Sequence, residues 1–148
     1  MNRFEQDWLQ ARVSLGAAAG WKADEMRVVA DLGYKLAEQG RNHEAITIFE
    51  GLAALAPATS YFQTALGALR LRIGELQEAL GHLNAALAAD AADIAALTNR
   101  GEVYMRLEER AEAIRDLQNV VQLSERQATT VAPSPYLVRA RALLGQLT

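Results

Sequence analysis

Residues 65–80 read ALGALRLRIGELQEAL, and the leucines and alanines of this segment recur at helical spacing. Two glycines, Gly67 and Gly74, interrupt it seven residues apart. A glycine inside a helix costs about 1 kcal/mol relative to alanine. We therefore interpret the segment as two helices joined by a turn at Gly74. Gly67 is then a position at which the second helix, around Ala79, packs closely against the first.

This pattern recurs along the chain with a period of 34 residues. One glycine opens each copy of the pattern, at Gly33, Gly67 and Gly101. Twelve residues after each glycine stands an alanine that follows a glutamate, at Ala45, Ala79 and Ala113. A fixed period of this length is typical of repeat proteins in which each unit is a pair of helices. An ordinary helical bundle with coincidental spacing is the alternative.

The turn residues divide each unit into two helices. Gly40 and Gly74 suit the left-handed ends of first helices, but the third unit has Glu108 there, which leaves the length of its turn open. Asn42 suits a helix N-cap, and Ser60 with Gln63 suits a capping box. The pattern predicts helices at residues 25–39, 42–55, 59–73, 76–89, 93–107 and 110–124.

The sequence predicts one all-α domain over residues 1–148, an α-solenoid of three units at 26–59, 60–93 and 94–127. Pro135 would break a fourth unit, so Ser134 and Pro135 instead begin a C-terminal capping helix at 134–148. Residues 1–25 form an N-terminal helical arm in this interpretation, with an apolar face of Phe4, Trp8, Ala11 and Leu15. The arm is expected to cap the first unit, or to serve as a homodimerisation arm or co-chaperone surface.

Composition excludes several kinds of function. The net charge of -3 and the pI near 5.4 give no basic surface for nucleic acid. No apolar run is long enough for membrane insertion, no signal peptide is apparent, and cysteine is absent, so we expect a cytoplasmic protein. His43 and His82 have no metal-ligand spacing, and no nucleotide-binding motif follows a strand. We therefore expect no catalytic residue, no metal, no cofactor and no enzyme activity.

The pattern resembles the tetratricopeptide repeat, a 34-residue helix-turn-helix unit. In that family a small residue at the eighth place and an alanine at the twentieth allow the two helices to approach closely. The large residue of the family at the twenty-fourth place is matched by Phe49, Leu83 and Leu117, and its closing proline by Pro57 alone.

A repeat array presents the first helices of its units on a concave surface, where protein or peptide partners bind. The inward places of each unit predict a small, apolar groove with a few large anchors. Asn99 stands at the sixth place, where the resemblance implies a hydrogen bond to the ligand backbone. The predicted peptide-binding groove comprises Ala30, Tyr34, Tyr61, Thr64, Ala68, Leu71, Asn99 and Met105. The alternative places Leu71 and Met105 in the core, with the tyrosines filling gaps between units.

Residues 48–80 are similar to the class II chaperones of bacterial type III secretion, the translocator chaperones. The residues that carry this similarity are Ile48, Phe49, Gly51, Leu52, Ser60, Tyr61 and Phe62. The resemblance implies a chaperone that keeps a secreted translocator soluble by holding an extended apolar segment in its groove. The alternative is a tetratricopeptide scaffold or co-chaperone in the assembly of a secretion, pilus or other multiprotein complex. The clamp of lysines and asparagines that holds acidic tails of heat-shock chaperones is missing from the fifth and ninth places.

Overall fold

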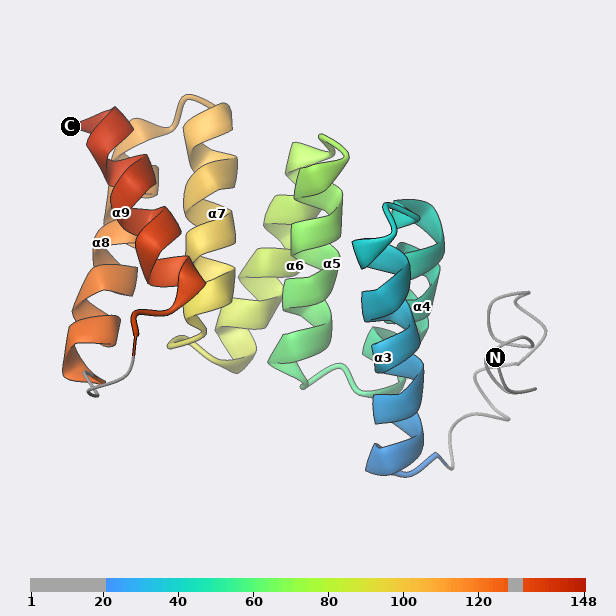
Figure 1. Ribbon diagram of the computed structural model, residues 1–148. Coiled ribbons are helices and arrows are strands. Elements are labelled where there is room, and N and C mark those ends of the chain that lie inside the picture. The colour runs from blue at the N-terminus through green and yellow to red at the C-terminus, as the bar shows by residue number, and fades with distance from the viewer. Residues whose placement is uncertain (1–20, 128–131) are drawn as a thin grey trace.

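The computed structural model describes residues 21–127 and 132–148, and this part of the chain forms a row of antiparallel helices without a strand (Figure 1). The described helices are α3 (Ala23–Glu38), α4 (Asn42–Leu55), α5 (Ser60–Arg72), α6 (Leu76–Ala89), α7 (Ile94–Arg106), α8 (Arg110–Arg126) and α9 (Pro135–Leu147). The predicted all-α solenoid is confirmed, with two helices in each predicted unit. The N-terminal arm lies outside the described residues, as do its proposed roles as a cap or a dimerisation element.

The turns between paired helices share one geometry. Gly40 and Gly74 take positive φ angles of 76° and 81°, and Glu108 takes 63° at the corresponding place. After each turn residue, the next backbone N–H donates to a carbonyl five residues back, as in Glu75 to Arg70 at 2.9 Å and Glu109 to Tyr104 at 2.8 Å. This is the Schellman pattern, which closes a helix C-terminus. The third turn therefore has the same length as the first two, although a non-glycine residue occupies the left-handed position.

The glycines at the eighth place make room for the large residue at the twenty-fourth place. A Cβ atom on Gly67 would lie 2.5 Å from Leu83, and one on Gly101 would lie 2.7 Å from Leu117. In the first unit Phe49 would lie 2.8 Å from a Cβ on Gly33. The expected close approach of the two helices is present, but its immediate partner is the large side chain and not the alanine.

Two predicted caps were wrong. Arg41 is the N-cap of α4, and Asn42, its first residue, accepts a hydrogen bond from Arg72. Thr59 is the N-cap of α5, while the Ser60 hydroxyl donates to the Asp93 carboxylate at 2.8 Å. Both side chains are taken by residues of the neighbouring unit, which local sequence does not reveal. The predicted cap of α9 is confirmed, because Ser134 Oγ accepts from the Tyr136 N–H at 3.1 Å.

Helix α9 continues the array beyond the third unit. It packs against both α8 and α7, in the way that α7 packs against α6 and α5. Its residues Leu137, Ala140 and Leu147 are buried, and Ala140 and Leu147 join a core cluster with Leu117 and Val120 of α8. The predicted capping position is thus occupied. In the described part of the chain, no helix is long and apolar enough to cross a membrane.

Candidate functional site

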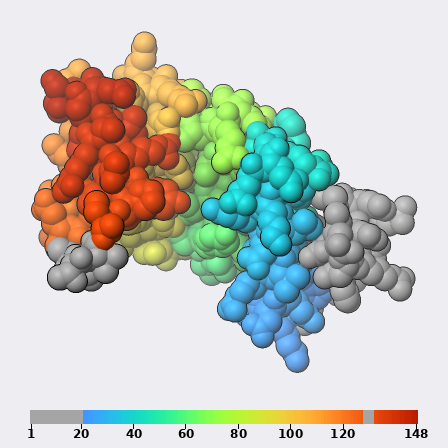
Figure 2. All heavy atoms as spheres, viewed as in Figure 1, coloured from blue at the N-terminus to red at the C-terminus, as the bar shows by residue number. Residues whose placement is uncertain are grey.

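The first helices of the units, α3, α5 and α7, lie on the same side of the array, and α9 joins them there (Figure 1). We call this surface the first-helix face. In the space-filling view, α9 in red and α3 in blue flank the green surface of α5 (Figure 2). Tyr34 on α3 is 56% exposed and Tyr61 on α5 is 52% exposed, which is unusual for side chains of this size. These two predicted anchors are therefore open to solvent.

Tyr61 is held at its base by two phenylalanines. Its ring packs edge-on against Phe49, with 6.2 Å between ring centroids, and against Phe62, with 5.8 Å. Burial raises the pKa of the Tyr61 phenol, and Asp31, Tyr34 and Tyr136 raise it further through their charges. Tyr61 thus combines a fixed ring with a free edge, which suits contact with a partner at low entropic cost.

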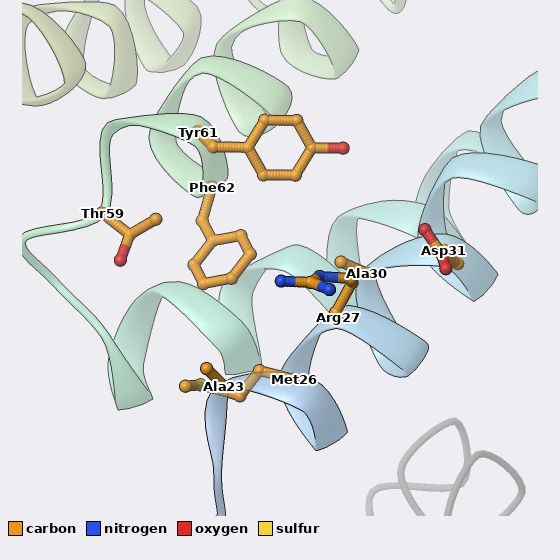
Figure 3. Close-up of a pocket in the computed structure, with 8 residues that line it drawn as sticks. All are labelled: Ala23, Met26, Arg27, Ala30, Asp31, Thr59, Tyr61 and Phe62. Atoms are coloured by element: carbon orange, nitrogen blue, oxygen red, sulfur yellow. The ribbon is translucent and has the colours of Figure 1, made fainter.

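A pocket of about 340 Å³ opens between α3 and the start of α5 (Figure 3). Its lining residues are Ala23, Met26, Arg27, Ala30, Asp31, Thr59, Tyr61 and Phe62. Ala30, a predicted groove residue, is buried here, and the small side chain leaves space that a larger one would fill. Figure 3 shows Tyr61 and Phe62 on one side of the pocket and the side chains of α3 on the other. An apolar side chain of a partner would fit between them.

The predicted groove residues at the centre of the array are tied into the packing between units. The Thr64 hydroxyl donates to the Asp93 carboxylate at 2.7 Å, and that carboxylate also caps the start of α7 by accepting from the Ala96 N–H. Leu71 is only 4% exposed and lies in a core cluster between the second and third units, while Ala68 is half-buried. A role of these three side chains in binding stays a prediction.

The predicted residues of the third unit lie against α9. Asn99 is 5% exposed, and its Oδ1 accepts a hydrogen bond from Arg139 Nη1 at 2.9 Å. Arg139 also pairs with Glu102. Met105 is half-buried and packs against the core cluster that α7 and α8 share with α9. In this structure the Asn99 oxygen thus has an internal partner, and its expected hydrogen bond to a ligand backbone stays a prediction.

Tyr136 was missed by the sequence analysis. It is 39% exposed on the first turn of α9, and the charges of Tyr34 and Asp93 raise its pKa after the larger effect of burial. Tyr136 is the second residue of α9, as Tyr61 is the second residue of α5. Counting from helix starts, instead of in steps of 34, would have found it. The first-helix face therefore carries three exposed tyrosines, from α3, α5 and α9.

The remaining polar clusters are structural. Arg100 donates two hydrogen bonds to the buried Asp116 carboxylate, at 2.7 and 2.8 Å, and joins α7 to α8. His82 Nδ1 lies 2.9 Å from Gln63 Oε1, and burial lowers the pKa of His82. Within residues 21–127 and 132–148, no group of three or more histidine, cysteine or acidic side chains could hold a metal ion.

Comparison with known proteins identifies the class. Residues 94–127, the third predicted unit, match the family model of the tetratricopeptide repeat. No curated protein is significantly similar to this sequence. Together with the helix pairs described above, the family match establishes an α-solenoid of tetratricopeptide repeats.

Several solved structures share the fold at low sequence identity. PcrH of Pseudomonas aeruginosa, in complex with the chaperone-binding region of PopD, superposes with a TM-score of 0.77 at 21% identity, covering 86% of this chain and 94% of that one. The Yersinia enterocolitica type III secretion chaperone SycD, bound to a peptide of the translocator YopD, gives 0.72 at 21% identity, covering 85% and 94%. The first tetratricopeptide domain of Spaghetti (RPAP3), bound to the HSP90 peptide SRMEEVD, gives 0.73 at 21% identity, covering 85% and 92%. The chain thus resembles translocator chaperones as well as other peptide-binding tetratricopeptide domains.

Proposed function

We propose that this protein is a non-enzymatic class II chaperone of type III secretion, which holds an extended apolar segment of a translocator on its first-helix face. The observation that carries this proposal is the pair of exposed tyrosines, Tyr34 and Tyr61, beside the pocket between α3 and α5. Exposed aromatic side chains next to an apolar pocket mark a surface that gains free energy when a partner covers it.

The mechanism is burial of apolar side chains that would otherwise aggregate. A partner segment laid across α3 and α5 would place one apolar side chain in the pocket of about 340 Å³ and others against the tyrosine rings. Removing each large apolar side chain from water contributes roughly 1.5–3 kcal/mol. Binding of this kind is stoichiometric and needs neither ATP nor a metal. It would take place in the cytoplasm, before secretion.

An acidic peptide of the kind bound by the RPAP3 domain is disfavoured as the partner. Recognition of a peptide carboxylate needs lysine or arginine side chains aimed at it. The fifth and ninth places of the three units are Ala30 and Tyr34, Thr64 and Ala68, and Thr98 and Glu102, none of which is basic. Asp31 and Glu102 on this face would also repel a negatively charged peptide.

Co-expression tests the proposal. A translocator with long apolar segments, encoded beside this gene, is expected to be soluble only when it is expressed with this protein. The double variant Tyr34→Asp/Tyr61→Asp should fail to keep it soluble, while its circular dichroism stays helical. A translocator that is equally soluble alone would contradict the chaperone role. Retention by the folded double variant would point instead to a scaffold that binds through another surface.

A further inference from the structure

Two carboxylates border the tyrosines of the first-helix face without a cationic partner. Asp31 is exposed on α3 and lines the pocket together with Tyr61. Asp93 is half-buried before α7 and accepts hydrogen bonds from Ser60, Thr64 and the Ala96 N–H. Among the residues that the structure describes, neither carboxylate forms an ion pair. The hydrogen bonds to Asp93 fix its position but leave its negative charge in place.

The other charged groups on this face are neutralised or lie apart. Glu102 pairs with Arg106 at 3.0 Å and also with Arg139. Arg27 lines the pocket at the end nearer the start of α3, and its nearest printed acidic partner is Asp24 at 3.8 Å. The region between α3, α5 and α9 therefore has a net negative charge from Asp31 and Asp93.

The three exposed tyrosines surround this negative region. Tyr34, Tyr61 and Tyr136 come from α3, α5 and α9, and the electrostatic influence of each on another shows that they share one neighbourhood. The faces of aromatic rings attract cations, and the attraction contributes roughly 0.5–2 kcal/mol depending on desolvation. Phenol rings beside unpaired carboxylates form a surface that favours an ammonium or guanidinium group over a neutral one.

We propose that the segment bound by this protein carries a lysine or arginine, whose cationic group docks among Tyr34, Tyr61 and Tyr136 beside Asp31. This inference rests on the proposed function and adds a partner specificity to it. Apolar residues of the segment fill the pocket, while the basic residue fixes the register of the segment along the face. Helix α9 is then part of the binding surface through Tyr136, in addition to capping the array.

A selection experiment tests this inference separately from the proposed function. The full-length protein is immobilised and used to select from a phage-displayed library of random linear peptides. Selected peptides are then synthesised in pairs, with lysine or with glutamine at the enriched basic position. Their Kd values are measured for the wild type, for Asp31→Asn and for Tyr136→Leu. Glu78→Gln is the matched control, because it removes one exposed negative charge from α6, away from this face.

The wild type is expected to enrich apolar peptides with lysine or arginine at one position, and glutamine there should weaken binding about 5- to 30-fold. Asp31→Asn and Tyr136→Leu should each reduce that ratio, and Glu78→Gln should leave it unchanged. Apolar peptides selected without a basic preference would overturn the inference alone. An unchanged lysine preference in Asp31→Asn would do the same. Failure to enrich any peptide would overturn the proposed function as well.

Discussion

Asn99 on α7 and Arg139 on α9, forty residues apart in the chain, are joined by a hydrogen bond of 2.9 Å that anchors the last helix on the array. Arg139 also pairs with Glu102, so one side chain links α9 to two positions of α7. Since Asn99 is buried, its oxygen loses its hydrogen bond when Arg139 is removed.

Replacement of this arginine tests the anchor. Arg139→Ala is expected to lower the free energy of unfolding by about 1–3 kcal/mol, because a buried acceptor is left unsatisfied. Urea denaturation measures this change, and hydrogen exchange should show faster exchange in α9. Arg141→Ala, on an exposed position of the same helix, is the control. Equal stability of the two variants would show that the contact does not hold α9.

A second arginine links consecutive units. Arg72 Nη1 donates to the Ala37 carbonyl at 2.8 Å and to Asn42 Oδ1 at 3.1 Å, and Arg106 repeats the first bond one unit later, to the Leu71 carbonyl at 3.5 Å. The bonded carbonyls are near helix C-termini, where intrahelical donors are lacking. Arg72→Ala is expected to cost about 1 kcal/mol in urea denaturation. Arg115→Ala on exposed α8 surface should change stability far less, and the reverse order would contradict this account.

The glycine at the eighth place can be tested by a pair of alanine substitutions. Gly67→Ala would put a Cβ atom 2.5 Å from Leu83, so we expect a loss of about 1–3 kcal/mol from overpacking. Gly81→Ala on α6 meets nothing within 4 Å and should stabilise by up to about 1 kcal/mol, because alanine is the better helix former. Thermal denaturation of both variants compares them directly. A neutral Gly67→Ala would contradict the close-packing role.

His82 predicts a dependence of stability on pH. Burial, and then the nearby charge of Arg70, lower the pKa of His82 below its ordinary value. The unfolded chain therefore binds a proton at higher pH than the folded one, so stability falls as pH drops through about 6.5 towards the lower folded pKa. The Tm of the wild type should decrease more between pH 7 and pH 5 than that of His82→Gln. Parallel decreases would show that His82 is not responsible.

The periodic part of the fold could be predicted from the sequence, because its determinants recur at fixed spacing. The 34-residue period placed every described helix to within two residues, including α4 and α6 with no error. It also identified Gly67 and the left-handed turn at Gly74. The left-handed Glu108 was not foreseen as such, since only the surrounding helix ends impose that conformation on a residue other than glycine.

The candidate site was less accessible to sequence reasoning. The repeat register named Tyr34 and Tyr61, both exposed, but gave no means of separating them from Thr64 and Leu71, which are tied into the packing between units. That separation depends on contacts between units. Tyr136 and Arg139 were missed because the connection before α9 has a different length, which shifts this helix out of the 34-residue register.

The choice of groove variants follows from this distinction. Leu71→Asp would place a charge in a core cluster and unfold the protein, so it cannot report on binding. Tyr34 and Tyr61 are the suitable pair, since both are more than half exposed. Gln77→Asp/Gln118→Asp is the matched control, with two negative charges added on exposed positions of the second helices α6 and α8.

The central claim is that the first-helix face holds the partner segment, and fluorescence anisotropy with a labelled translocator segment tests it most directly. The Tyr34→Asp/Tyr61→Asp variant, shown to be helical by circular dichroism, should bind at least about 30-fold more weakly than the wild type, because two apolar contacts of about 1 kcal/mol or more each are lost. The Gln77→Asp/Gln118→Asp control should bind as the wild type does. Wild-type affinity in the tyrosine variant, with affinity lost in the control, would contradict the account and place binding on the second helices.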